Sequence, residues 1–337
     1  MSPPETFQTV ESRTRGETSG AYTQYMSTAN PDVQRPHSVT DEGCIRLDGR
    51  LVAQNLSFCI ATSVTSFREA TGFPPGLAVV MIGEDPASTI YVQRKHETCK
   101  HLGMNSWMHH LPNDASPEDV LSLIQALNDT PEVNGILVQL PLPKHLDEKM
   151  TLQTIHPSKD VDSLHPCNLG KLLTQESQLI PCTPQGCLRI LDHYAIPLAG
   201  KHALMIGRSR IVGLPMSILL THRHCTVTIA HSHTEDLPAL CARADIVVAA
   251  LGRPAYIKGE WLKPKATVLD VGLTRLHHAD GPPHLCGDVD TAAVEHVAAI
   301  TPVPGGVGPM TLMCLMANTV IAAHLQQDTP VPSALAR

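Results

Sequence analysis

The chain has 337 residues, of which 42% are apolar and only 3% aromatic, and its formal net charge is −7. This length suits one large domain or two ordinary ones, and so few aromatic residues predict a core of aliphatic side chains. Because general polyanion binders are usually basic, the acidic charge argues against DNA or RNA as a main partner.

The first 42 residues are rich in Ser, Thr, Pro and Gln and lack periodicity, which predicts a disordered extension. The extension lacks the apolar stretch of a secretory signal, and its acidic residues disfavour a mitochondrial presequence. We expect no membrane partner, because no apolar run in the sequence is long enough to cross a bilayer.

The ten cysteines are scattered without a C-x-x-C pair, which fits a reducing compartment and a cytoplasmic protein. Histidines gather at 222–225, 231–233 and 277–278. None of these groups has a recognised ligand spacing, so we predict no metal site.

A first α/β series begins after residue 43. Asp85 followed by Pro86 predicts a helix N-cap with proline at the first helical position. Apolar patterning predicts helices at 49–71, 86–102 and 117–127, and strands at 77–83, 105–110 and 135–140. The order βαβαβ predicts an α/β fold with a mostly parallel sheet.

A second series follows, in which Thr183 and Pro184 repeat the cap-then-proline signal for a helix over 184–194. We predict strands at 203–206, 226–230, 245–251 and 267–272, with helices after Pro215 and near 237–243. These elements predict a doubly wound, Rossmann-like domain, which is followed by an apolar helix over 310–325.

The turn after strand 203–206 contains Gly207, Arg208 and Ser209 and leads into a helix. Backbone N–H groups at such a helix start can hold a phosphate. The turn is not the standard G-x-G-x-x-G, and an ordinary βαβ turn with incidental polar residues is the alternative.

The end of strand 226–230 indicates which nucleotide binds. NAD enzymes usually place an acid there for the ribose hydroxyls, whereas this chain has His231, Ser232 and His233. Ser232 can donate a hydrogen bond to a 2′-phosphate and Arg208 can supply positive charge, so the sequence favours NADP.

Ser88, Tyr91 and Lys95 are spaced to lie on one face of the helix after Asp85. A lysine in a partly dry cleft loses proton affinity and can act as an acid or base near neutral pH. The alternative is a solvated lysine beside a core tyrosine.

Three further features are placed for ligand binding. Gln139 ends strand 135–140, where α/β proteins bind ligands, although it can equally be a satisfied strand-end amide. Asp160 or Asp162 could accept hydrogen bonds from a heterocycle, or simply form a turn. The glycines between Pro304 and Pro309 allow close backbone approach to a ligand, or form a flexible connector.

Together these motifs resemble the bifunctional methylenetetrahydrofolate dehydrogenase/methenyltetrahydrofolate cyclohydrolase family. The similarity covers residues 44–325 and includes EDPASTIYVQRK, GILVQLPLPKHL, PSKDVDSLHPCNLGKL, PCTPQG, GKHALMIGRSRIVGLPM, TVTIAHSHT and TPVPGGVGPMT, in family order. It implies an N-terminal folate and catalytic domain (43–182), a Rossmann-like NADP domain (183–304), and a loop and helix (305–328) that pack back on the first domain. A cleft would lie between the domains.

The resemblance also implies a reaction. NADP would take hydride from 5,10-methylenetetrahydrofolate, and water would open the methenyl product to 10-formyltetrahydrofolate. A homodimer, a role in one-carbon metabolism and purine biosynthesis, and tetrahydrofolate derivatives as ligands are further implications.

By position, Lys95 matches the catalytic lysine, Gln139 the residue that tunes it, Tyr91 a ring that stacks on the substrate, and Asp162 the pterin anchor. The resemblance further implies substrate contacts at Ser88, Val138, Leu140, Pro304, Gly305, Gly306, Val307 and Gly308, and cofactor contacts at Thr183, Gly207, Arg208, Ser209, Ser232 and Leu273.

One departure concerns Ser163, which stands where the family usually has glycine. If that position needs a positive φ, serine strains the turn and shifts Asp162. NAD-using relatives with a phosphate-and-magnesium arrangement carry arginine at the Ser232 position, so its absence agrees with NADP and no metal.

Three other readings stay open. The chain could be an NADP dehydrogenase for a cyclic hydroxy acid, a non-catalytic folate-binding relative, or an enzyme that retains only one of the two activities.

Overall fold

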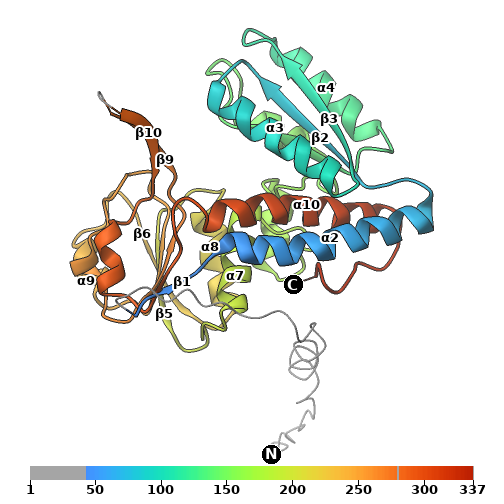
Figure 1. The fold of residues 1–337 in the computed structure, drawn as a ribbon. Coiled ribbons are helices and arrows are strands. Elements are labelled where there is room, and N and C mark those ends of the chain that lie inside the picture. The colour runs from blue at the N-terminus through green and yellow to red at the C-terminus, as the bar shows by residue number, and fades with distance from the viewer. Residues whose placement is uncertain (1–42, 279–280, 337) are drawn as a thin grey trace, which may run out of the picture. The chain divides into compact units, whose positions relative to one another are not determined.

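The computed structural model describes residues 43–278 and 281–336, which form two parallel sheets flanked by helices (Figure 1). The predicted α/β fold is confirmed. The predicted disordered extension at 1–42 lies outside the described residues.

The smaller sheet has the strand order β3-β2-β4, formed by β2 (Gly76–Ile82), β3 (Asn105–Leu111) and β4 (Gly135–Val138). Every residue of the central strand β2 is buried, as expected when a parallel strand is covered on both faces. Helices α3 (Pro86–His101) and α4 (Pro117–Asp129) connect the strands. The first two predicted strands are confirmed to within one residue at each end, whereas β4 ends at Val138 and leaves Gln139 just beyond it.

The larger sheet is also wholly parallel, with the strand order β1-β11-β8-β7-β5-β6. Its strands are β1 (Ile45–Arg46), β5 (His202–Ile206), β6 (Thr226–Ala230), β7 (Ile246–Ala249), β8 (Thr267–Asp270) and β11 (Ala299–Ile300). β1 pairs in this sheet, although the predicted boundary at residue 43 assigned it to the first domain. Two-residue strands such as β1 and β11 are too short to produce a hydrophobic period, so the sequence did not predict them.

The remaining elements are short. They are α5 (Glu148–Thr154), α6 (Pro166–Leu173), α8 (Gly213–His222), α9 (Leu237–Cys241), the 3-10 helices η1 (Gly259–Trp261) and η2 (Thr291–Glu295), and the antiparallel pair β9 (Thr274–His278) and β10 (Gly281–Cys286). The β9–β10 pair and α6 had not been predicted.

Helix α10 (Val307–Gln326) packs along α2 (Gly49–Thr71) and α7 (Cys182–His193), and Figure 1 shows α10 and α2 side by side. The bounds predicted for α2 are confirmed. A Cβ atom at Gly49 would overlap the carbonyl oxygen of Gly306, so glycine at residue 49 lets the chain entering α10 lie against the start of α2.

Three helices begin earlier than predicted for one shared reason. We placed Pro184, Pro215 and Pro309 at or before the first helical residue, but each is the third residue of its helix, in α7, α8 and α10 respectively. The first turn needs no backbone N–H donors, so it tolerates proline at any of its positions. Thr183 therefore lies inside α7 and is not its N-cap, which is Pro181.

Helix α10 is also long and apolar enough to cross a membrane by length and composition alone, contrary to our expectation that no segment is. Most of its side chains are buried against other helices, including Met316 and Val320. The central helix of a protein core passes the same test, so its composition is explained by packing.

Candidate active site

Helix α3 carries Ser88, Tyr91 and Lys95, the three residues predicted to lie on one face. Its first turn is fixed by Asp85, whose Oδ2 accepts a hydrogen bond of 2.7 Å from the backbone N–H of Ser88. Ser88 is buried, the side chain of Lys95 is half-buried, and Tyr91 is 41% exposed. The exposed ring of Tyr91 is free to stack on a ligand.

The amine of Lys95 is held by Gln139. Its Nζ donates a hydrogen bond of 2.7 Å to Oε1 of Gln139, whose Nε2 donates in turn to the carbonyl of Leu140 at 2.7 Å. The second bond fixes which way the Gln139 amide faces, so Lys95 meets a neutral acceptor. The predicted pair is thus brought together from α3 and the end of β4.

Burial lowers the pKa of Lys95, while the nearby Asp162 and Cys182 oppose that shift. Desolvation disfavours the charged form of an amine, whereas a neighbouring negative charge favours it. A lysine whose burial outweighs its counter-charge gives up its proton more readily than a surface lysine, so Lys95 is suited to acid–base chemistry.

The structure separates the roles of the two candidate carboxylates. Asp160 is buried and accepts hydrogen bonds from the backbone N–H groups of Leu164 and His165 and from Nδ2 of Asn168, at 3.2, 2.8 and 2.8 Å. These bonds commit Asp160 to its own turn. Asp162 instead interacts with Lys95, so Asp162 is the carboxylate left for a ligand.

Asp162 sits among protein atoms while keeping part of its surface exposed. Burial raises the pKa of its carboxyl group, and Lys95 and a hydrogen bond from Cys182 oppose that rise. Burial, Asp162 and neighbouring Cys314 likewise raise the pKa of the Cys182 thiol well above its usual value. The thiol therefore stays protonated at neutral pH and acts as a donor.

Ser163 occupies the left-handed region with φ of +57°, so this position does require the conformation that glycine adopts most easily. Such a conformation costs a non-glycine residue about 1–3 kcal/mol. The buried Oγ of Ser163 donates a 2.8 Å hydrogen bond to the carbonyl of Leu179, which offsets part of that cost. A shift of Asp162 caused by this serine stays a prediction.

The glycine-rich segment predicted to close over a ligand is only partly a loop. Pro304, Gly305 and Gly306 precede α10, whereas Val307 and Gly308 are its first two residues. Gly305 has φ of +113°, and a Cβ atom there would lie 3.0 Å from Nε of Arg50. The positive φ favours glycine here, whereas the Arg50 side chain could move away from a Cβ atom.

The start of α10 is also tied to α7. Oγ1 of Thr311 donates a hydrogen bond of 3.2 Å to Oγ1 of Thr183. The predicted folate loop and the predicted cofactor contact at Thr183 are thereby brought close together.

The predicted phosphate turn is tightly folded. Gly207 has φ of +122° and a Cβ atom there would overlap the carbonyl of Ala250, while one at Gly213 would overlap the carbonyl of Gly207. Oγ of Ser209 accepts from the backbone N–H of Val212 at 3.1 Å, which leaves its hydroxyl hydrogen available to a ligand. Glycine at 207 and 213 therefore lets this turn pack closely against neighbouring backbone.

The other predicted cofactor contacts are open to solvent. Arg208 and Ser232 are exposed, and Leu273, which follows β8, is 44% exposed. The acid nearest to Ser232 along the chain is Glu235, which is exposed. The next one, Asp236, is used elsewhere, since its Oδ1 accepts a hydrogen bond of 3.3 Å from the N–H of Ala239 at the start of α9.

Sequence reasoning missed a buried pair of carboxylates that supports the loop after β7. Asp288 accepts hydrogen bonds from the backbone N–H groups of Leu251, Gly252 and Arg253 at 2.5, 3.1 and 2.8 Å. Asp270 accepts from the N–H of Asp288 at 2.9 Å, and burial raises the pKa of Asp270 to about 6. The available signal was an aspartate within two residues of a glycine in both VLDVG and GDVD.

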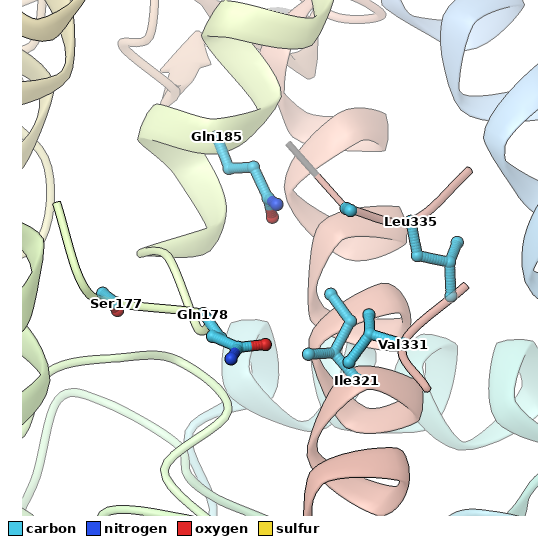
Figure 2. Close-up of a pocket in the computed structure, with 7 residues that line it drawn as sticks. Ser177, Gln178, Gln185, Ile321, Val331 and Leu335 are labelled. Atoms are coloured by element: carbon cyan, nitrogen blue, oxygen red, sulfur yellow. The ribbon is translucent and has the colours of Figure 1, made fainter. Parts of the chain in front are cut away.

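Cavities and metal sites do not add to this site. A cavity of about 240 Å³ lies between α7 and α10, where Figure 2 shows Gln185 pointing inward opposite Ile321. Its lining residues, which include none of the predicted site residues, are Ser177, Gln178, Gln185, Ile321, Val331, Leu335 and Ala336.

Within residues 43–278 and 281–336, no three His, Cys, Asp or Glu residues are grouped to hold a metal. The cleft between the domains stays a prediction.

Comparison with known proteins places this geometry in a family. Residues 47–162 match the model of the catalytic domain of tetrahydrofolate dehydrogenase/cyclohydrolase, and residues 181–327 match the model of its NAD(P)-binding domain. The chain is 51% identical over 288 residues to "Bifunctional protein FolD 3" of Rhizorhabdus wittichii, covering 85% of this chain and 95% of the relative. It is 52% identical over 285 residues to "Bifunctional protein FolD" of Paramagnetospirillum magneticum, covering 84% and 97%.

Solved structures agree. The bifunctional FolD enzyme of Campylobacter jejuni is 39% identical with a TM-score of 0.79, covering 83% of this chain and 98% of that one. The Trypanosoma brucei methylenetetrahydrofolate dehydrogenase-cyclohydrolase, solved with NADP cofactor and an inhibitor, is 34% identical with a TM-score of 0.81, covering 85% and 99%. Both lobes therefore have the fold of these enzymes, and this chain belongs to the tetrahydrofolate dehydrogenase/cyclohydrolase family.

Proposed function

We propose that this chain oxidises 5,10-methylenetetrahydrofolate to 5,10-methenyltetrahydrofolate with NADP and hydrolyses the product to 10-formyltetrahydrofolate. The observation that carries the proposal is the half-buried amine of Lys95, which is held by Gln139 and whose pKa is influenced by the charge of Asp162. The names of the bifunctional relatives, and the NADP in the Trypanosoma brucei structure, support it.

Asp162 and Tyr91 bind the substrate in this proposal. The carboxylate of Asp162 accepts hydrogen bonds from the N–H and amino groups of the pterin, because Asp160 is committed to its own turn. The exposed ring of Tyr91 stacks on the aminobenzoyl group. Ser88, Val138, Leu140 and the 304–308 segment complete the surface around the folate.

Lys95 then moves the proton during hydrolysis. Its neutral amine does not repel the methenyl cation, and it accepts a proton from the water that adds to the methenyl carbon. The ammonium so formed donates that proton to the ring nitrogen whose bond to the carbon breaks, while the hydroxyl proton of the intermediate leaves to solvent. Gln139 keeps the amine pointed at the reacting carbon throughout.

The predicted contacts in the Rossmann-like domain suit NADP. When bound, it supplies the hydride acceptor for the first reaction. The Gly207 turn is tightly folded at the start of α8, Arg208 offers positive charge, and Ser232 offers a hydroxyl just after β6. A carboxylate in the Ser232 position would repel the 2′-phosphate that distinguishes NADP from NAD.

We also propose a cytoplasmic homodimer that acts in one-carbon metabolism and purine biosynthesis, without nucleic-acid or membrane partners. The edge strand β6 supports pairing through the cofactor domains, because Ile229 on it is 39% exposed and its outer backbone edge has no strand beside it among the described residues. Sedimentation velocity that gives the mass of a single chain at all concentrations would refute the dimer.

Assays of both activities separate this proposal from the open alternatives. Formation of methenyltetrahydrofolate, followed by absorbance with NADP and with NAD in parallel, tests the first reaction. Hydrolysis of added methenyltetrahydrofolate tests the second. A chain with only one activity, or with neither, would point to the reduced or non-catalytic alternative.

Replacing Lys95 with methionine keeps the side-chain length and removes the amine. We expect the cyclohydrolase rate of Lys95→Met to fall at least about a hundredfold, as is typical when a general acid–base group is lost, with little change in NADP affinity. Stopped-flow absorbance and a cofactor titration measure the two. The exposed neighbour Arg94 provides the control Arg94→Met, and full hydrolytic activity in Lys95→Met contradicts the assignment.

Replacing Asp162 with asparagine removes the negative charge that raises the pKa of Lys95. The pKa of the amine then falls further, so the rising limb of the cyclohydrolase kcat against pH moves to lower pH. The folate KM rises as well, because the pterin loses a charged acceptor. Glu97→Gln, on the exposed face of α3, is the control; an Asp162→Asn limb that stays in place or moves to higher pH argues against the coupling.

Introducing a carboxylate at Ser232 tests the cofactor placement. We expect Ser232→Asp to weaken NADP binding by more than about tenfold, because like charges facing each other cost several kcal/mol. NAD binding, which lacks the 2′-phosphate, should be spared. Ser232→Ala separates loss of the hydroxyl from gain of charge, and equal NADP affinities in wild type and Ser232→Asp would rule out this placement.

A further inference from the structure

Helix α10 carries one fully buried amide in the middle of its apolar sequence. Asn318 has no exposed surface, and its Nδ2 donates hydrogen bonds to the carbonyl oxygens of Val161 and Ile180, both at 2.8 Å. Nδ2 also lies 3.6 Å from Sγ of Cys182. A single side chain thus bridges two chain segments that are more than a hundred residues away from it in sequence.

Both carbonyl groups belong to the active-site framework. The carbonyl of Val161 is part of the peptide bond that leads into Asp162, and the carbonyl of Ile180 immediately precedes Pro181, the N-cap of α7. The thiol of Cys182 lies beside the same turn. Its Sγ is 3.4 Å from the carbonyl oxygen of Val161, and the thiol also forms a hydrogen bond with the carboxylate of Asp162. Asn318 therefore fixes the backbone directly before Asp162.

Stability alone does not account for an amide at this position. Oδ1 of Asn318 is buried without a hydrogen-bond partner, which disfavours the folded state. Neighbouring α10 residues such as Leu315 and Ala322 are apolar and fully packed. An apolar side chain of similar volume would avoid the unpaired oxygen, but the Ile180 carbonyl would lose its amide donor and the Val161 carbonyl would keep only the Cys182 thiol.

We propose that Asn318 is a positioning residue for the folate reactions, and that it sets the place of the Asp162 carboxylate relative to the Lys95 amine. It touches no reacting atom and acts through the Val161 carbonyl. The proposal rests on the proposed function, in which Asp162 anchors the pterin. Loss of the amide should let the 160–162 turn move and should weaken folate binding more than NADP binding.

The test compares two variants with a control from the next residue. Asn318→Leu removes both donors and also the unpaired oxygen, while keeping similar volume. Asn318→Ser keeps one hydroxyl donor and should restore part of the function, and it carries the test if Asn318→Leu does not fold. Thr319→Val is the control, because Thr319 is equally buried but its Oγ1 bonds only to Leu315 of its own helix.

Steady-state kinetics with methylenetetrahydrofolate and NADP, together with thermal unfolding, give the readouts. We expect the folate KM to rise at least about tenfold in Asn318→Leu and by less in Asn318→Ser, with the NADP KM nearly unchanged. Thr319→Val should match wild type. Variants that lose thermal stability or active fraction while keeping the wild-type folate KM would overturn the inference.

Failure of this inference is distinguishable from failure of the proposed function. Wild-type protein that does not turn over methylenetetrahydrofolate would overturn the proposed function, and the positioning role with it. Active wild-type protein with an unchanged folate KM in both Asn318 variants would overturn the positioning role alone.

Discussion

The short hydrogen bond from Lys95 to Gln139 is the interaction on which the chemistry of this molecule depends. An amine can serve as both acid and base near neutral pH only if its charged form is destabilised, and burial does this here while Asp162 limits the effect. A carboxylate acceptor in place of Gln139 would stabilise the ammonium form. The amide instead orients the amine without adding charge, because its own direction is fixed by the carbonyl of Leu140.

The fold brings this pair together with the rest of the site through helix packing. Lys95 comes from α3, Gln139 follows β4, and α10 supports the turn that contains Asp162. Since α10 also packs along α2 and α7, one apolar helix contacts segments that carry both predicted folate residues and predicted cofactor residues. Such an arrangement places polar groups accurately with few bonds, because well-packed cores do not deform continuously.

The periodicity of apolar residues and the helix-capping residues predicted most helices and strands. Where a predicted bound was wrong, the limits of these two signals explain the error. The bounds of α2 followed from its apolar period and those of α3 from Asp85. The starts of α7, α8 and α10 were placed too late, since proline fits anywhere in a first turn. The pairing of Lys95 with Gln139 was expected from family resemblance, whereas the supporting roles of Asp288 and Asn318 depend on contacts between distant segments, which no local pattern reveals.

The central claim is most directly tested by measuring the proton affinity of Lys95 itself. In protein labelled with carbon-13 at lysine Cε, the chemical shift of each lysine reports its titration, and the Lys95 signal is the one absent from a Lys95→Arg variant. We expect Lys95 to titrate at lower pH than the exposed lysines in the same spectrum, because burial lowers its pKa. A Lys95 signal that titrates together with the exposed lysines, or at higher pH, would contradict it.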